Sequence, residues 1–580
     1  MSNFNPLSNA KIPQHRSSFD MSSKRLFTSK AGILIPVWWQ HANPNDVFEI
    51  SGDWFTRTIP VNTSAYTRIR EYYDFFAVPL RLISRSLPQA FTQMAEYSTS
   101  ASSSNSNTPV YTNVPYMPLS QISSYVVAMG SIGAGDDVGY SQDAGALRLL
   151  NMLGYGPVLN SATPNIDTVF GHYSQVSDIK GYQYRVNHSV NVLPLAAYQK
   201  IYFDFYSNSQ WEKHLAYSYN FDYWDGSSVL PSSGLADLFK IRYANWNKDW
   251  FFGMLPNSQY GDVALMPSYA NPDVHSNALV RRSIQGSDNR NQAFYQRNGS
   301  DSLQTQSPSA ASFNVPVTIN SDLSALSIRA TEYLQRWKEI VQFGSKDYTD
   351  QIERQFGIKA PEYMGNHCHY IGGWSSDIVI NEVVNTNLDS ADSQASIAGK
   401  GIASGSGHKL TFKAGAEHCV VMCIYHAVPV CDWSSVGTDP KLTCTAITDF
   451  PQPAFDQLGM TPVPNTAMDN SQRWRASATD EKPVNYGYNL RYWQFKSDND
   501  YVRTGFFSNG SYRSWVAPIE FTLATRVDLY GYKAFKVNPS VLDNIFVARA
   551  DSTVDSDQFL NNINIRCYKV SNLDRDGLPF

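Results

Sequence analysis

Histidine and cysteine side chains gather in one short stretch, His418, Cys419, Cys423 and His426, which is the densest group that could bind a metal ion. Its valine, isoleucine and tyrosine content indicates a β-strand. At about 3.3 Å per residue, the two histidines of a strand would lie roughly 26 Å apart and the two cysteines roughly 13 Å apart. Zinc bonds are only about 2 Å long, so we expect no shared zinc site. Buried cysteines that fill apolar space are the better interpretation.

Other groups of candidate ligands are weaker. His367 and His369 would share one face of a strand, but two histidines alone make a poor metal site. Aspartates near the carboxyl end lack the ordered oxygen spacing of a calcium loop, and hydrogen-bonded turns explain them better. These residues are Asp551, Asp555 and Asp557, and separately Asp574 with Asp576. We therefore predict no metal and no cofactor.

Motifs for phosphate binding and for nucleophilic catalysis fail on their spacing. Gly399-Lys400 has no glycine five residues before it and no serine or threonine after it, so it is not a Walker loop. The run 404–407 alternates serine and glycine but lacks the pattern of a nucleophile elbow. No pair of carboxylates can be singled out as the acid and base of a glycosidase. The sequence therefore predicts a protein that is not an enzyme.

Positive charge is concentrated at the amino end. The chain has 46 lysines and arginines against 51 acidic residues, and its formal charge of −5 opposes wholesale wrapping by nucleic acid. The first 30 residues contain one acidic residue, Asp20, and five basic ones, which are Lys11, Arg16, Lys24, Arg25 and Lys30. This basic arm is a candidate for phosphate contacts without base readout. Intersubunit hydrogen bonds or simple solvation remain alternatives.

Aromatic residues make up 13% of the 580 residues and charged residues 17%. Extended interfaces favour tyrosine and tryptophan, although a tyrosine-rich β protein would have the same composition. Trp246 and Trp250 stand beside two phenylalanines and could stack on bases, but a core or a subunit interface is the preferred interpretation. Together with Trp38 and Trp39 they are the candidate interface aromatics.

Six cysteines do not make a disulfide scaffold, and the amino terminus lacks the apolar core of a secretory signal. We expect synthesis in a reducing cytoplasm. No run reaches the roughly 18 apolar residues that span a bilayer, so membrane insertion is not expected.

Strands are expected in the first and the last parts of the chain. β-Branched and aromatic residues predict strands over 32–40, 47–58 and 72–78, with a tight turn over 43–46. Helices are expected from Ser86 through Met94, over 193–211, from Ser321 or Asp322 through Phe343, and over 348–356. Strands return over 377–386, 409–413, 418–427, 519–530 and 564–570, and the serine- and glycine-rich stretches 98–109 and 389–407 are expected to be loops. The two ends of the chain must then pair, as in a jelly roll with Greek-key connections.

Several ordered motifs are similar to those of a known family. The series FDMSSKR, GILIPVWWQ, NPNDVFEIS and RTIPVNTSAYTRIREYYDFFAVPLRLI resembles the amino-terminal region of the major capsid proteins of microviruses, which are small single-stranded DNA bacteriophages, and is closest to the gokushovirus-like or gut-associated branch. Further similarity follows at 242–264, 328–363 and in motifs such as DFPQPAFDQLGM and NLDRDGLPF. Relatives often have glycine where this chain has Asn45, and asparagine tolerates the positive φ that the turn requires.

The resemblance implies a mainly β fold, an eight-stranded antiparallel jelly roll with long, partly helical insertions. We expect a basic arm over 1–31 and a single capsid domain over 32–580. Insertions are expected roughly over 95–190, 265–320 and 388–408, and the second of these is the candidate surface loop.

It also implies the function: a structural protein that self-assembles into a T=1 icosahedral shell around circular single-stranded DNA and presents loops to the bacterial host surface. The implied partners are further copies of the chain, the DNA genome, the scaffolding, DNA pilot and small basic DNA-binding proteins, and a host receptor. We therefore expect the protein to assemble in the host cytoplasm and to be located in the virion. A secreted or surface β-sandwich protein that binds or cleaves carbohydrate is the alternative, which the many tryptophans and tyrosines permit.

Overall fold

The computed structural model describes residues 15–61, 65–92, 113–130, 142–156, 188–212, 215, 218–222, 224, 236–265, 280–281, 293–296, 303–306, 325–345, 347–359, 361, 365–384, 397–434, 437–467, 485–507, 510–519, 535–546 and 557–575. The chain divides into two compact units, residues 1–258 with 345–580, and residues 259–344. Each unit is described by itself.

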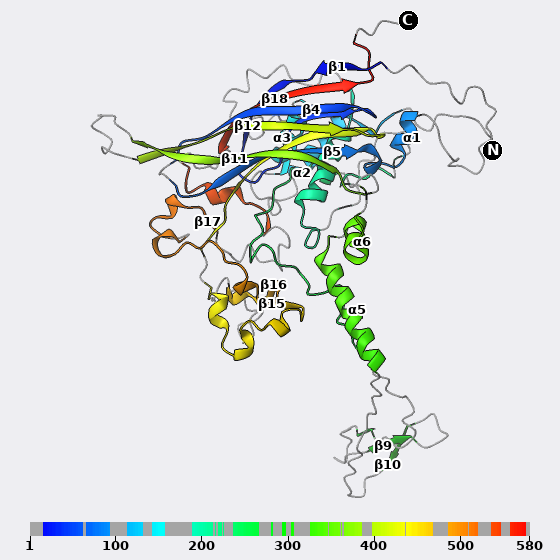
Figure 1. Cartoon of the computed structure of the whole chain (residues 1–580), viewed down its shortest axis with the longest axis vertical. Coiled ribbons are helices and arrows are strands. Elements are labelled where there is room, and N and C mark those ends of the chain that lie inside the picture. Colours follow the sequence, from blue (N-terminus) through cyan, green and yellow to red (C-terminus); the bar gives the residue numbers. More distant parts are fainter. Residues whose placement is uncertain are drawn as a thin grey trace, which may run out of the picture. The chain divides into compact units, whose positions relative to one another are not determined.

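A large antiparallel sheet dominates the first unit (Figure 1). Its strands are β1 (Ser17–Asp20), β2 (Ser23–Ser29), β3 (Ile35–Ala42), β4 (Val47–Thr58), β5 (Ile69–Pro79), β11 (His369–Val384), β12 (Ile397–Lys413), β13 (Cys419–Pro429) and β18 (Phe559–Ser571). The order is β1-β18-β4-β12-β11-β5-β13-β3, and β2 also pairs with β18. β1 and β2 pair with successive parts of β18, so the nine described strands occupy eight positions. The two ends of the chain therefore lie side by side, as expected.

The sequence pattern explains the two faces of the sheet. Side chains of β4 alternate between buried and partly exposed from Phe48 to Thr58, as a strand with one face on a core requires. β13 is buried along its whole length, which matches a sequence that is apolar apart from His426.

Aromatic contacts show that the sheet curls on itself. The rings of Phe27 in β2 and Tyr425 in β13 lie 5.1 Å apart, although these strands are near opposite ends of the strand order. Trp54 in β4 and Tyr73 in β5 lie 5.3 Å apart across two intervening strands. The predicted mainly β, jelly-roll type of fold is confirmed.

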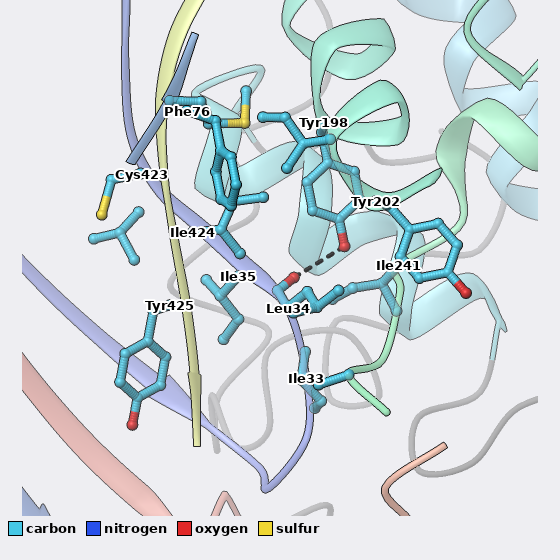
Figure 2. Close-up of a cluster of buried hydrophobic side chains, with 14 of the residues drawn as sticks. Ile33, Leu34, Ile35, Phe76, Tyr198, Tyr202, Ile241, Cys423, Ile424 and Tyr425 are labelled. Atoms are coloured by element: carbon cyan, nitrogen blue, oxygen red, sulfur yellow. Dashed lines mark hydrogen bonds between the residues drawn. The ribbon is translucent and has the colours of Figure 1, made fainter. Parts of the chain in front are cut away.

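The first unit also contains helices, and two of them pack on β3, β5 and β13. These helices are α1 (Leu87–Thr92), α2 (Leu119–Gly130), α3 (Gln142–Leu153) and α4 (Leu193–Ile201), which continues as a π-helical turn η5 (Tyr202–Tyr206). Every residue of α4 is buried. Figure 2 shows Tyr198 facing residues 33–35, and its hydroxyl donates a hydrogen bond to the Leu34 carbonyl at 2.9 Å. The helix predicted over 193–211 is thus confirmed as a buried helix that ends earlier.

Short elements complete the first unit. α6 (Tyr348–Phe356) begins at Asp347, whose carboxylate accepts from the Thr349 amide, and ends at Gly357 in the left-handed region, as the sequence predicts. The small strands are β6 (Tyr116–Pro118), β7 (Ser189–Asn191), β14 (Asp432–Trp433), β15 (Met460–Pro464), β16 (Asn485–Leu490) and β17 (Pro518–Ile519). The 3₁₀ helices are η2 (Leu80–Leu82), η7 (Ala236–Phe239), η9 (Pro440–Thr443), η10 (Ile447–Asp449), η11 (Pro453–Phe455), η12 (Asn465–Ala467), η14 (Trp493–Phe495), η15 (Thr504–Phe506), η16 (Arg513–Trp515) and η19 (Pro539–Leu542).

The second unit contains a small antiparallel sheet and one long helix. Its elements are β8 (Val280–Arg281), β9 (Ala293–Gln296), β10 (Leu303–Gln306) and α5 (Ala325–Phe343). The expected caps Ser321 and Asp322, and most of the candidate loop 265–320, lie outside the described residues. The same holds for the expected loop over 98–109 and for most of the expected strand over 519–530.

Two expectations are corrected. The serine- and glycine-rich loop over 389–407 is wrong from residue 397 onward, because β12 begins there and its glycines make room for two indole rings. The basic arm over 1–31 is not an arm throughout, because β1 and β2 belong to the large sheet.

Candidate assembly and nucleic-acid surfaces

The five basic residues of the amino end have different environments. Lys11 lies outside the described residues. Arg16 is exposed, and its guanidinium donates to the Asn45 carbonyl at 2.6 Å, so it helps to close the turn between β3 and β4. Lys24 and Arg25 are exposed neighbours on β2. Lys30 is only 7% exposed, and burial of this kind removes it from any phosphate surface of the folded chain.

The four candidate interface tryptophans are mostly core residues. Trp38, Trp246 and Trp250 are 1%, 5% and 7% exposed, so they stabilise the chain itself and offer little area to another subunit. Trp39 is partly buried, and its indole N–H donates to the Leu153 carbonyl at 2.9 Å. This hydrogen bond links β3 to α3, and part of the Trp39 side chain remains exposed.

The aromatic cluster around Trp250 is organised by a half-buried carboxylate. Phe251 and Phe252 pack against Trp433 with ring centroids 4.6 and 4.9 Å apart. Asp249 accepts from the Trp433 indole N–H at 2.6 Å and from the Phe252 amide at 2.7 Å. Burial raises the pKa of Asp249. Rings enclosed in this way cannot stack on bases, and of the two preferred interpretations, core or subunit interface, their burial fits the core.

Another carboxyl, that of Glu71, lies inside the curled sheet. Glu71 is fully buried and accepts hydrogen bonds from the hydroxyls of Thr56 and Ser376, each at 2.7 Å. Burial raises its pKa, and these hydrogen bonds partly oppose the rise. Tyr425 donates to the same carboxyl at 3.4 Å. The group has hydrogen-bond partners but is closed to solvent, which suits a structural role rather than proton transfer to a substrate.

The candidate metal ligands do not converge. His418 stacks on Phe91, with ring centroids 4.4 Å apart, whereas His426 stacks on Tyr72 at 4.9 Å. Burial lowers the pKa of His426 to about 3, so the imidazole is neutral. Within the described residues, no group of three or more histidine, cysteine or acidic side chains could hold a metal ion. No described helix is both long enough and apolar enough to cross a membrane.

Broad exposed apolar surfaces are the feature that sequence patterns missed. One is a shallow groove of about 480 Å³ over β2, β4 and β18, lined by Leu26, Phe55, Arg57 and Leu560 among others. The second is helix α5, of which only Gln342 is buried. Its exposed apolar residues are Leu326, Ile328, Tyr333, Leu334, Trp337 and Phe343. The third lies on residues 440–458. The sequence could have indicated these surfaces through apolar residues in stretches that show neither the alternation of a strand nor the spacing of a core-facing helix.

Comparison with known proteins decides the family. A family model described as capsid protein (F protein) matches residues 159–524, which is well over half of the chain. The chain belongs to this F capsid protein family. It is also 22% identical to the capsid protein VP1 of Chlamydia phage 1 over 582 aligned residues, which cover 86% of each protein.

Membership of the F capsid protein family confirms the resemblance to microvirus capsid proteins. It gives the protein a structural role in the virion of a bacteriophage, in a shell built from copies of itself. Broad exposed apolar faces fit this role, because large patches of this kind on a soluble chain mark surfaces that a partner covers.

Proposed function

We propose that this chain self-assembles into a T=1 icosahedral shell that encloses a circular single-stranded DNA genome and presents loops to the bacterial host surface. The observation that carries the proposal is the match of residues 159–524 to the F capsid protein family. The jelly-roll type of sheet supports it as a rigid body from which insertions extend. The carbohydrate-directed alternative is not favoured.

Assembly would be driven by repeated contacts among identical surfaces. A closed symmetric shell presents the same patches many times, so contacts that are weak singly become strong together. The three exposed apolar surfaces described above provide area for such contacts.

DNA would bind through charge and not through base recognition. Lys24 and Arg25 on β2, with Arg16 just before β1, are the described cations of the amino end that remain at the surface. Because every phosphate contact releases counterions, the affinity would fall as the salt concentration rises. Lys11 would add one more contact.

The remaining partners follow from the family. The insertions, above all 265–320, would form the surface relief that meets the host receptor. Internal scaffolding, DNA pilot and small basic DNA-binding proteins would complete assembly in the host cytoplasm.

Electron microscopy of the purified full chain tests the proposal. Closed particles of one size with T=1 symmetry, which protect single-stranded DNA from nuclease, are expected when chain and DNA are mixed or co-expressed. Chains that stay monomeric at high concentration and protect no DNA would contradict it.

The DNA contact has its own test. The double substitution Lys24→Ala with Arg25→Ala should weaken single-stranded DNA binding and reduce the slope of log affinity against log salt by about 0.7 for each lost phosphate contact. Lys413→Ala, at an exposed position in β12, is the control and should leave the slope unchanged. A double variant with the wild-type slope would remove these two residues from the DNA surface.

A further inference from the structure

Residues 440–458 form an ordered segment that is hardly buried at all. In Figure 1 the segment is drawn in yellow near β15 and β16, away from the nine-stranded sheet. It consists of the three short helices η9, η10 and η11, joined by turns. Five large apolar side chains on it are between 46% and 84% exposed: Leu442, Ile447, Phe450, Phe455 and Leu458. Side chains of this kind normally supply the core of a chain, and here they face outward.

Local hydrogen bonds and ion pairs hold the segment in shape. The Asp449 carboxylate accepts from the amides of Thr445 and Ala446 at 3.0 and 2.8 Å. Lys496 forms an ion pair with Asp456, and Lys441 forms one with Asp498 at 3.3 Å. The segment is therefore preorganised without a core of its own, which lowers the entropy lost when a partner binds.

The charges of the segment indicate the chemistry of its partner. Lys441 and Asp456 are each paired with a residue of 496–498, and the Asp449 carboxylate is occupied by backbone amides. What remains at the surface is mostly apolar, with the one negative charge of Asp449 held by backbone amides. A nucleic acid requires unpaired cations, so it would gain little here. A neutral apolar protein surface would gain most, because both sides would lose water-exposed apolar area.

We propose that the surface formed by Leu442, Ile447, Phe450, Phe455 and Leu458 is an intersubunit contact, and that its occupant is a second copy of this chain. The inference rests on the proposed function and deepens it. The segment lies inside the residues that match the F capsid protein family. A capsid protein of the proposed kind contacts copies of itself on every side of the subunit. Phe495 extends the surface, since its ring lies 6.3 Å from that of Phe450. Six such side chains provide on the order of several hundred Å², a large share of the ~800 Å² that each partner contributes to a standard interface.

The reactivity of the Cys444 thiol can show whether this surface is covered. Cys444 is partly exposed within the segment, whereas the other five cysteines are buried. Burial also raises the pKa of those thiols, to about 12 in Cys419 and Cys567, which slows their alkylation further. We expect maleimide to label Cys444 rapidly in unassembled subunits and at least tenfold more slowly in intact particles. Equal labelling rates in the two states would overturn the inference.

A substitution at Ile447, the most exposed position of the surface, tests the intersubunit contact without disturbing the fold of the subunit. Ile447→Asp places a charge on a side chain that is 84% exposed, so the subunit should fold with an unchanged unfolding midpoint. It should lose at least 90% of particle yield, because the charge would be buried without a partner. Ile447→Val is the matched control and should assemble like the wild type.

The outcomes separate a failure of the proposed function from a failure of this contact. If the wild type forms no particles, the proposed function fails. If the wild type and Ile447→Asp form particles with equal yield, the shell stands and this surface is not part of its contacts. If Ile447→Asp also lowers the unfolding midpoint, the segment packs within its own chain, and the inference is overturned.

Discussion

Gly407 in β12 lies directly against the indole of Trp374: a Cβ atom at this glycine would come within 2.2 Å of the ring. Gly405 stands in the same relation to Trp54, and the two indoles stack with centroids 5.8 Å apart. Gly405 and Gly407 therefore leave room for two large rings in the interior of the sheet. Stacking of an aromatic side chain over a strand glycine also restores packing that the glycine lacks.

Gly407→Ala should destabilise the subunit by about 1–3 kcal/mol, because the added methyl group overpacks the site and must displace Trp374. Urea unfolding followed by tryptophan fluorescence measures the loss. Ser404→Ala, at an exposed position in the same strand, should change stability by less than about 0.5 kcal/mol. Equal effects of the two substitutions would contradict the packing argument.

Phe27→Ala should cost about 3–5 kcal/mol, since its ring joins β2 to Tyr425 and so closes the curled sheet. The neighbouring residue gives an ideal comparison: Leu26 is 71% exposed, and Leu26→Ala should be nearly neutral for stability. Thermal unfolding of unassembled subunits checks both. If Phe27→Ala is as stable as the wild type, the closure does not contribute to the fold.

The buried carboxyl of Glu71 should make the stability of the subunit depend on pH. Burial raises its pKa above the ordinary value of 4.5, so its contribution to stability is complete below pH 4.5 and is lost as the pH rises through the higher pKa of the folded state. Glu71→Gln keeps the size and the hydrogen-bonding capacity and removes the titration. The slope of unfolding free energy against pH above 4.5 should become less negative by at most about 1.4 kcal/mol per pH unit.

The control for this prediction is Glu49→Gln, at a partly exposed position in β4 paired with Lys409. It changes the net charge equally, so it separates the effect of the lost charge from that of the buried carboxyl. An unchanged slope in Glu71→Gln would show that the buried carboxyl titrates alike in the folded and unfolded chain.

Asn45 has a φ of 67° in the turn between β3 and β4. Asn45→Ala should destabilise the subunit by about 1 kcal/mol or slightly more, because a Cβ without a local hydrogen bond disfavours the left-handed region. Asn45→Gly should be neutral or slightly stabilising. Denaturant unfolding of the three proteins compares them, and a stable alanine variant would refute the conformational argument.

Much of the fold follows from local chemistry. β4 was predicted with the bounds that the structure has, because its alternating pattern and the flanking turn are both local signals. α6 is correct for the same reason, since Asp347 and Gly357 mark its ends within the sequence. The turn at Asn45 also follows from residue type alone.

Other features depend on residues far away in the chain. Glycine and serine in β12 look like a loop until Trp54 and Trp374 are placed over them. Lys30 looks like part of a basic arm until β1 and β2 pair with β18, some 540 residues later.

The sequence by itself determined that this is a mainly β chain with a helical middle, and its ordered motifs indicated a capsid protein. Tertiary structure alone decided which aromatic residues are buried and which apolar residues remain for partners. Trp38, Trp246 and Trp250 lie in the core, while Ile447 and Leu458 face outward. The physical reason is that burial depends on what the rest of the chain brings against a side chain, and a residue's type gives only its tendency to be covered.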